Sequence, residues 1–173
     1  ETFSKFSQQE QTARAVTDLD IIYEDTDILL INKPAGMLSQ PDDTKEPSMV
    51  EYLIGYLLQN GSLTEENLRT FHPSVCNRLD KNTSGVIAAG KSLAGLQELS
   101  TLFHDRTVHK DYLCIVKGKL TRSRHIRGYL HKDANLNKVS VSPTKERDAQ
   151  PIETQYTPIC NNEHATLLKV RLI

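Results

Sequence analysis

The sequence has 173 residues, of which 38% are hydrophobic and 25% are charged, as in an ordinary soluble globular domain. Its 21 Lys and Arg against 22 Asp and Glu leave a net charge of -1, so composition excludes a strongly basic nucleic-acid-binding protein, and any basic surface must be local. Three cysteines without metal-ligand spacing favour reduced thiols, and no stretch approaches the ~20 apolar residues of a membrane span. We therefore expect a cytoplasmic protein without a metal site.

The N-terminal region divides into a polar segment and a hairpin. Residues 1–18 are rich in Gln, Ser, Thr and charge, which predicts an extension, and residues 19–173 are expected to form one domain. Two β-rich runs, 20–23 and 28–32, flank four polar residues and predict a β-hairpin. Lys33-Pro34-Ala35-Gly36 then forms a turn, in which Lys33 is either a solvated cation or a phosphate contact.

Two helices are indicated by apolar residues at helical spacing. The first begins after Ser48, which is spaced from Glu51 as a capping box, and ends at Asn60-Gly61. Tyr52 and Tyr56 lie on its apolar stripe, which favours a place in the core over a role in base stacking. The second helix is expected over residues 92–104.

A charged pair lies inside otherwise apolar sequence between these helices, in Arg78-Leu79-Asp80 followed by Thr83-Ser84-Gly85. Apolar residues before and after it predict two buried segments joined by a polar turn, the second being a strand over residues 86–90. If the run is extended, Arg78 and Asp80 project from the same face and can share one pocket. The alternative is structural: Asp80, Thr83 and Ser84 cap the turn, and Arg78 is a surface cation.

The second half of the chain reads as β-structure. Residues 108–118 alternate with period two, which places Lys110 and Tyr112 on one face of a strand. The most basic region follows as a hairpin strand, and it is either a phosphate-tracking surface or a solvated strand face; its arginines are Arg122, Arg124 and Arg127. A return strand is expected over 139–142, and two further β-rich runs span 152–160 and 165–173.

The central run resembles the signature of the RluA-type family of RNA pseudouridine synthases, His-Arg-Leu-Asp-x-x-Thr-Ser-Gly, with Asn77 in place of the histidine. Residues 31–37, Ile-Asn-Lys-Pro-Ala-Gly-Met, resemble the family's first motif, which is assigned a structural role. Lys110-Asp111-Tyr112 resembles its Lys-x-Tyr strand, whose tyrosine lies under the target base. The resemblance implies an α+β fold with a mixed, largely antiparallel β-sheet flanked by helices.

The resemblance also implies a reaction and roles for residues. The expected reaction is isomerisation of uridine to pseudouridine in structured RNA, ribosomal or transfer, without a cofactor. Asp80 is the implied catalytic residue, Arg78 and Tyr112 contact the substrate, and Thr83, Ser84 and Gly85 form a supporting turn. Candidate contacts to the RNA backbone are Lys33, Lys110, Arg122, Arg124 and Arg127.

The main departure from the family is at the end of the sequence, where the third motif, Thr-Gly-Arg-x-His-Gln-Ile-Arg, is absent. In the family its first arginine pairs with the catalytic aspartate. We therefore expect a catalytic domain truncated at its C-terminal end, inactive as it stands if that arginine is required, with an uncovered sheet edge that favours self-association or a partner chain. The alternative function is a noncatalytic RNA-binding or assembly module that retains an incomplete synthase fold.

Overall fold

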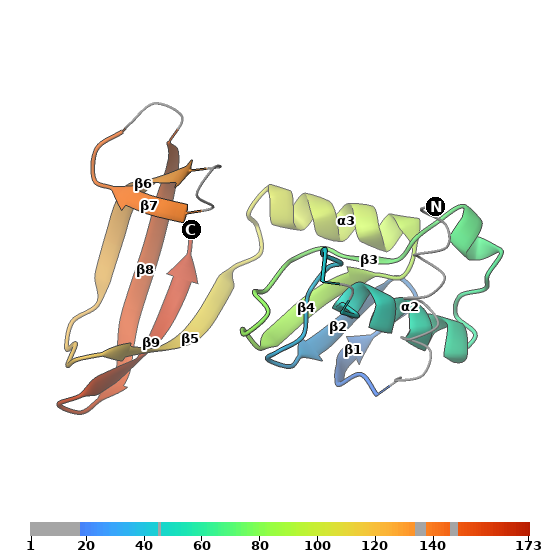
Figure 1. Cartoon of the computed structure of the whole chain (residues 1–173), viewed down its shortest axis with the longest axis horizontal. Coiled ribbons are helices and arrows are strands. Elements are labelled where there is room, and N and C mark those ends of the chain that lie inside the picture. Colours follow the sequence, from blue (N-terminus) through green and yellow to red (C-terminus); the bar gives the residue numbers. More distant parts are fainter. Residues whose placement is uncertain (1–17, 45, 134–137, 146–148) are drawn as a thin grey trace. The chain divides into compact units, whose positions relative to one another are not determined.

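The structure is a computed structural model that describes residues 18–44, 46–133, 138–145 and 149–173 (Figure 1). The chain divides into two compact units, with the boundary between Asp105 and Arg106. We call residues 18–105 unit 1 and residues 106–173 unit 2. The predicted extension over residues 1–18 lies outside the described residues except for Asp18. No helix in the described part of the chain is long and apolar enough to cross a membrane.

Unit 1 contains a four-stranded antiparallel sheet with the strand order β1-β2-β4-β3. Its first two strands form the predicted hairpin, in which Asp25 accepts hydrogen bonds from the backbone N–H groups of Asp27 and Ile28. The strands are β1 (Ile21–Glu24), β2 (Ile28–Lys33), β3 (Ser74–Val75) and β4 (Gly85–Gly90). Because β4 lies between β2 and β3, the loop that joins β3 to β4 lies at one end of this sheet and leads into an inner strand.

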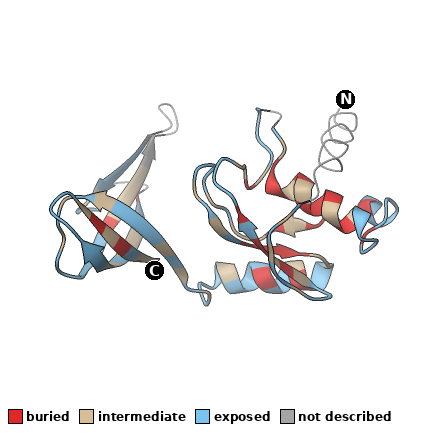
Figure 2. Cartoon of the chain, turned by 90° about the horizontal axis from the view of Figure 1, so that it is seen from below, coloured by how far each residue is buried: buried red, intermediate tan, exposed pale blue. Residues whose placement is uncertain are grey.

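Helix α2 (Met49–Gln59) supplies the largest share of the core of unit 1. The predicted capping box is confirmed, because the side chains of Ser48 and Glu51 bond each other's backbone at the helix start. The core joins apolar residues of α2 to those of β2 and β4: Leu29, Ile31, Met49, Leu53, Ile54, Leu57, Ile87 and Ala89. Buried residues are accordingly concentrated in unit 1 (Figure 2).

Helix α3 (Leu93–His104) is also confirmed and packs against β4. Ser92 caps it by accepting a hydrogen bond of 3.0 Å from the backbone N–H of Gly95. A short 3-10 helix, η1 (Asn67–Arg69), precedes β3. Helices and an antiparallel sheet in one unit, and a second antiparallel sheet in the other, confirm the predicted α+β class.

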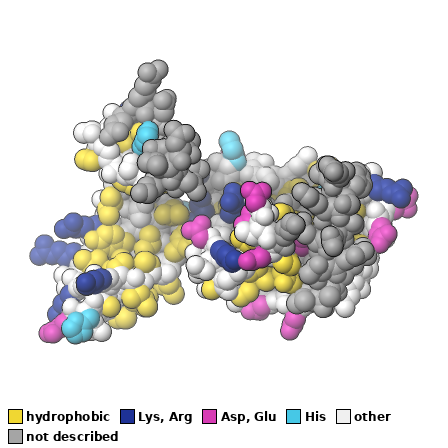
Figure 3. Space-filling model, in the orientation of Figure 1, with side chains coloured by type: hydrophobic (Ala, Val, Ile, Leu, Met, Phe, Trp, Pro, Cys, Tyr) yellow, Lys and Arg dark blue, Asp and Glu magenta, His cyan; other side chains and the backbone are white. Residues whose placement is uncertain are grey.

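Unit 2 contains a five-stranded antiparallel sheet with the order β5-β9-β8-β6-β7. Its strands are β5 (Lys110–Lys117), β6 (Arg124–Asp133), β7 (Lys138–Ser142), β8 (Gln150–Asn161) and β9 (Ala165–Leu172). The last strand, β9, is paired on both sides, so the edges of the sheet are β5 and β7. Apolar side chains gather on its surface (Figure 3), and Val141 is 60% exposed.

Candidate active site

The Arg78-Leu79-Asp80 run lies in the irregular segment between β3 and β4, and we call residues 77–84 the Asp80 loop. Leu79 is half-buried and packs against the core of unit 1, whereas Arg78 and Asp80 are exposed. The inward side chain therefore anchors the run, and its two charged neighbours face solvent. Among the described residues Arg78 and Asp80 form no ion pair, so the guanidinium does not hold the carboxylate directly.

The backbone of Leu79 is held by a side chain from a distant part of unit 1. The Ser39 hydroxyl donates a hydrogen bond of 2.6 Å to the Leu79 carbonyl and accepts one of 3.0 Å from the Leu79 N–H. Ser39 is itself buried, so these bonds are shielded from competing water. One hydroxyl thus satisfies both backbone groups of the residue between Arg78 and Asp80.

Asn77 fixes the entry to the loop by continuing the pairing of β3 with β4. Its side-chain amide donates to the Val86 carbonyl at 3.1 Å, and its side-chain oxygen accepts from the Ala88 N–H at 2.8 Å. The Asn77 side chain therefore makes the two hydrogen bonds to β4 that the backbone of a paired strand residue would make. The family signature has histidine here, and asparagine offers a donor and an acceptor on one flat amide, which suits this double bond.

The exit of the loop is held through the Lys81 carbonyl. This oxygen accepts hydrogen bonds from the Gly36 N–H at 2.7 Å and from the Lys33 ammonium at 3.2 Å. The ammonium also donates to the Pro34 and Met37 carbonyls, so all three of its N–H donors are used. The turn that follows β2 is thereby bonded to the Asp80 loop.

Lys33 is fully buried, which corrects its candidacy as an RNA backbone contact. Alternation along β2 puts Leu29, Ile31 and Lys33 on the same inward face, and this period-two signal was present in the sequence. Burial lowers the pKa of Lys33, and the negative charge of Asp80 opposes that shift. A buried cation therefore lies within electrostatic reach of Asp80.

The turn Thr83-Ser84-Gly85 returns the chain to β4. The Thr83 N–H donates to the Asp80 carbonyl at 2.9 Å, which closes a backbone turn directly after the aspartate. Gly85 has φ +136°, a conformation that other residues rarely adopt. Asp80 contributes its backbone to this turn, while its carboxylate makes no hydrogen bond to a described residue. The capping alternative thus receives no support from the Asp80 side chain.

Tyr112, the other expected substrate contact, lies in unit 2 on strand β5. The residue of β9 opposite Tyr112 is Val170, and the residue of β9 opposite Lys110 is Leu172. Since residues two apart on a strand share a face, the prediction that Lys110 and Tyr112 project from one face is confirmed. Both side chains are half-buried.

The basic region forms the first strand of a hairpin, as predicted, but its arginines do not share one face. Arg122 precedes β6, and Arg124 and Arg127 are three residues apart on it, so the last two project from opposite faces. Arg127 donates from Nε and Nη2 to Oε1 of Glu153 at 3.2 and 3.1 Å. Its charge is therefore already matched within the protein.

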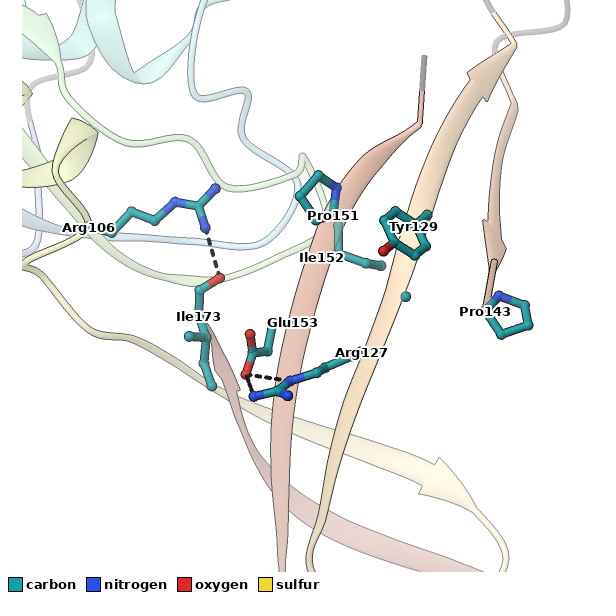
Figure 4. A pocket seen from close by; sticks show the side chains of 9 residues that line it. Arg106, Arg127, Tyr129, Pro143, Pro151, Ile152, Glu153 and Ile173 are labelled. Carbon is teal, nitrogen blue, oxygen red and sulfur yellow. Dashed lines mark hydrogen bonds and ion pairs between the residues drawn. The ribbon is translucent and has the colours of Figure 1, made fainter. Parts of the chain in front are cut away.

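A cavity of about 450 Å³ lies beside that ion pair in unit 2 (Figure 4). Its lining includes Tyr129 and Pro151, and Arg106 donates across it to the Ile173 carbonyl at 3.2 Å. None of the residues predicted as catalytic lies in it. The described residues also contain no group of three His, Cys, Asp or Glu side chains arranged to hold a metal ion.

The role of Ser39 as a supporting residue could not be predicted from the sequence. A serine six residues after a strand has no local pattern that distinguishes it, because its partner Leu79 is 40 residues away. Asn77 was noticed only as a departure from a motif. Its function as a backbone substitute depends on the antiparallel register of β4, which spacing alone does not give.

Comparison with known proteins gives a consistent result. A family model for RNA pseudouridylate synthase matches residues 27–173. The chain is 32% identical to ribosomal large subunit pseudouridine synthase D of Borreliella burgdorferi over 158 residues, which cover 87% of this chain and 46% of that protein. It is 30% identical to an uncharacterized RNA pseudouridine synthase of Mycoplasma pneumoniae, with coverages of 90% and 47%. The chain thus spans about half the length of these relatives.

Solved structures agree on the fold. Human RNA pseudouridylate synthase domain containing 4 matches with a TM-score of 0.71 at 21% identity, over 96% of this chain and 63% of that one. Human RNA pseudouridylate synthase domain containing 1 matches with a TM-score of 0.67 at 16% identity, over 90% and 60%. The family match over residues 27–173 confirms the resemblance carried by the Asp80 loop, and the chain belongs to the RNA pseudouridylate synthase family, in its RluA-type branch.

Proposed function

We propose that this protein isomerises uridine to pseudouridine in structured ribosomal or transfer RNA, with Asp80 as the catalytic residue. The observation that carries the proposal is the position of Asp80, an exposed carboxylate on a loop whose backbone is held before and after it by hydrogen bonds from the buried side chains of Ser39 and Lys33. Reactive groups need a fixed position and access to substrate, and this arrangement supplies both.

The reaction requires a carboxylate at the ribose. Uridine must lose its bond between N1 and C1′, turn within the site, and rejoin through C5, so no atom from outside the substrate is incorporated. An ionised carboxylate assists such a step as a nucleophile or by stabilising positive charge at C1′, as in glycoside hydrolysis. The Lys33 ammonium donates to the Lys81 carbonyl, directly after Asp80, so a buried cation lies near the carboxylate.

Arg78 and Tyr112 are proposed to hold the target nucleotide. A base inside a stem must leave its stack at a cost of a few kcal/mol, and an exposed guanidinium beside Asp80 suits contact with the adjacent phosphate. Tyr112 would stack on the extracted uracil, an interaction worth about 1–3 kcal/mol. Lys110, Arg122 and Arg124 are the proposed contacts to the RNA backbone, since Arg127 is already bonded to Glu153.

A second candidate function is a noncatalytic RNA-binding or assembly module. It is favoured by one observation: large apolar side chains of the unit 2 sheet are exposed, among them Leu113, Ile115 and Val141, as on a surface that binds a partner. Under this reading the chain also self-associates or binds a partner chain through a free edge of the unit 2 sheet, β5 or β7. Each function is expected in the cytoplasm, where structured RNA is accessible.

The test is release of tritium from RNA labelled at C5 of uridine, because rejoining through C5 expels that hydrogen. We expect release by the chain and none by Asp80→Asn, with RNA affinity and unfolding temperature unchanged, since the exposed carboxylate bonds no described side chain. Release by Asp80→Asn would remove Asp80 from the catalytic role. Binding without release, over a broad set of RNAs, would support the noncatalytic module.

A further inference from the structure

One face of the unit 2 sheet carries two tyrosines in the same cross-strand row. Val170 of β9 is opposite Tyr112 of β5 on one side and opposite Tyr156 of β8 on the other, and Tyr156 is opposite Arg124 of β6. Directly opposed residues in antiparallel strands project from the same face. The row therefore spans four strands, about 14 Å at the usual strand spacing. We call this surface the Tyr112 face.

The next row on the same face has a similar mixture of side chains. Lys110 is opposite Leu172, which is opposite Thr154, which is opposite Ile126. Leu172 is 42% and Ile126 is 48% exposed. The Tyr112 face therefore offers an open apolar and aromatic surface with a cation at each side, Lys110 on β5 and Arg124 on β6.

Charge is segregated between the two faces of this sheet. Among side chains that the structure describes on β5, β6, β8 and β9, the carboxylates of Asp111 and Glu153 both project from the opposite face. There Asp111 bonds Arg171 at 2.7 and 2.9 Å, and Glu153 bonds Arg127 and His125. Asp111 and Glu153 thus pair with three cations of that face, Lys169, Arg171 and Arg127, whereas no acid described on these strands shares the face of Lys110 and Arg124.

The two tyrosines also retain free hydrogen-bonding capacity. Both are half-buried, and neither hydroxyl bonds a described residue, whereas the Tyr23 and Tyr56 hydroxyls of unit 1 bond carboxylates. A tyrosine in apolar surroundings usually has a partner for its hydroxyl. Aromatic side chains on an open sheet face, flanked by unmatched cations, fit the bases and phosphates of single-stranded RNA.

We propose that the Tyr112 face is a binding platform for a single-stranded segment of RNA, in which Tyr156 stacks a second base beside the one held at Tyr112 and Arg124 contacts a phosphate. The proposal depends on the proposed function only for the class of ligand. The proposal adds Tyr156 as a second residue that stacks on a base. It also implies that the RNA around the target uridine is unpaired.

The experiment measures binding of a fluorescently labelled, uridine-containing 12-nucleotide RNA to the full chain by anisotropy, at several salt concentrations. Tyr156→Leu is expected to weaken binding about 5- to 150-fold, the range for loss of one base stack, and Tyr156→Phe should retain most of the affinity. Arg124→Ala is expected to reduce the slope of log K against log salt by about 0.7, the value for one phosphate contact with a single strand.

The sheet itself provides matched controls on its opposite face. Tyr129→Leu and Arg127→Ala remove the same chemistry from the same sheet, both on the same strand as Arg124, and both should bind the RNA as the parent does. Equal losses in the two sets, or no loss in either, would overturn the proposal. If Tyr156→Leu does not fold, the salt slopes of Arg124→Ala and Arg127→Ala decide the question.

Failure of this inference is distinguishable from failure of the proposed function. Tritium release that is unaffected by Tyr156→Leu, in a chain that binds the RNA as the parent does, would reject the platform and keep the synthase. Tight binding that needs Tyr156 and Arg124, without tritium release from the parent chain, would keep the platform and reject the synthase.

Discussion

Unit 1 buries its apolar side chains between a sheet and α2, whereas unit 2 leaves several of its own on the surface of a five-stranded sheet. Leu53 of α2 is fully buried, and Val141 of β7 is 60% exposed. The difference matches what the two proposed roles require. A reactive carboxylate needs a rigid mount, which a closed core and buried hydrogen bonds provide, while an RNA surface needs open aromatic and cationic side chains.

The largest effect that tests this comparison is expected from a core substitution in unit 1. Leu53→Ala should lower the free energy of unfolding of unit 1 by about 2–5 kcal/mol, because the substitution leaves a cavity in a closed core. Val141→Thr in unit 2 should change stability by less than about 0.5 kcal/mol. Amide hydrogen exchange followed by mass spectrometry resolves the two units. A large loss at Val141 would show that unit 2 has a closed core of its own.

A smaller effect is expected from loss of the two hydrogen bonds between Ser39 and the Leu79 backbone. Ser39→Ala leaves the half-buried N–H and carbonyl of Leu79 without their partner, at a cost of about 1–3 kcal/mol. Because those groups flank Asp80, we expect faster amide exchange in residues 77–84 and a lower kcat for tritium release with KM unchanged. Ser39→Thr keeps the hydroxyl and should restore part of both.

The matched control for Ser39→Ala is Ser92→Ala, which removes the N-cap of α3 at a cost of about 1 kcal/mol. It should lower stability without changing exchange in the Asp80 loop or kcat. If both serine variants lower kcat equally, the loss follows from lower overall stability. The Ser39 hydrogen bonds then have no specific part in positioning Asp80.

The smallest effect concerns the face of the unit 2 sheet opposite the Tyr112 face, and it depends on pH. The hydrogen bonds from Arg171 hold the pKa of Asp111 well below its ordinary value of 3.8. A carboxyl whose pKa is lowered by folding stabilises the fold above its unfolded pKa, and that contribution disappears as the pH falls through the folded pKa. Parent and Asp111→Asn should therefore differ in stability at neutral pH and converge below about pH 4.

Denaturant unfolding at a series of pH values measures this difference. Because the ion pair is exposed to solvent, added salt should reduce the gap between the two proteins. A gap that stays constant to pH 2 would mean that the Asp111 carboxyl is not stabilised by Arg171. Arg171 would then not be matched by an acid within the protein, as Arg127 is by Glu153.

Local patterns in the sequence determined the elements of both units. The capping box at Ser48 and the helical spacing behind it predicted α2, and alternation predicted β5 with Lys110 and Tyr112 on one face. The resemblance of the Asp80 loop to a family signature gave the family and the fold class, which the family match confirms. These signals act within a few residues along the chain, so one sequence is enough to read them.

Only the tertiary structure decided which side chains meet. Ser39 and Leu79 are 40 residues apart, Lys33 and Lys81 are 48 apart, and their hydrogen bonds exist because the chain returns beside β2. Strand order placed β9 inside its sheet and put Tyr156 in the row of Tyr112. Pairing between distant strands depends on the packing of the whole fold, and spacing along the chain carries no record of it.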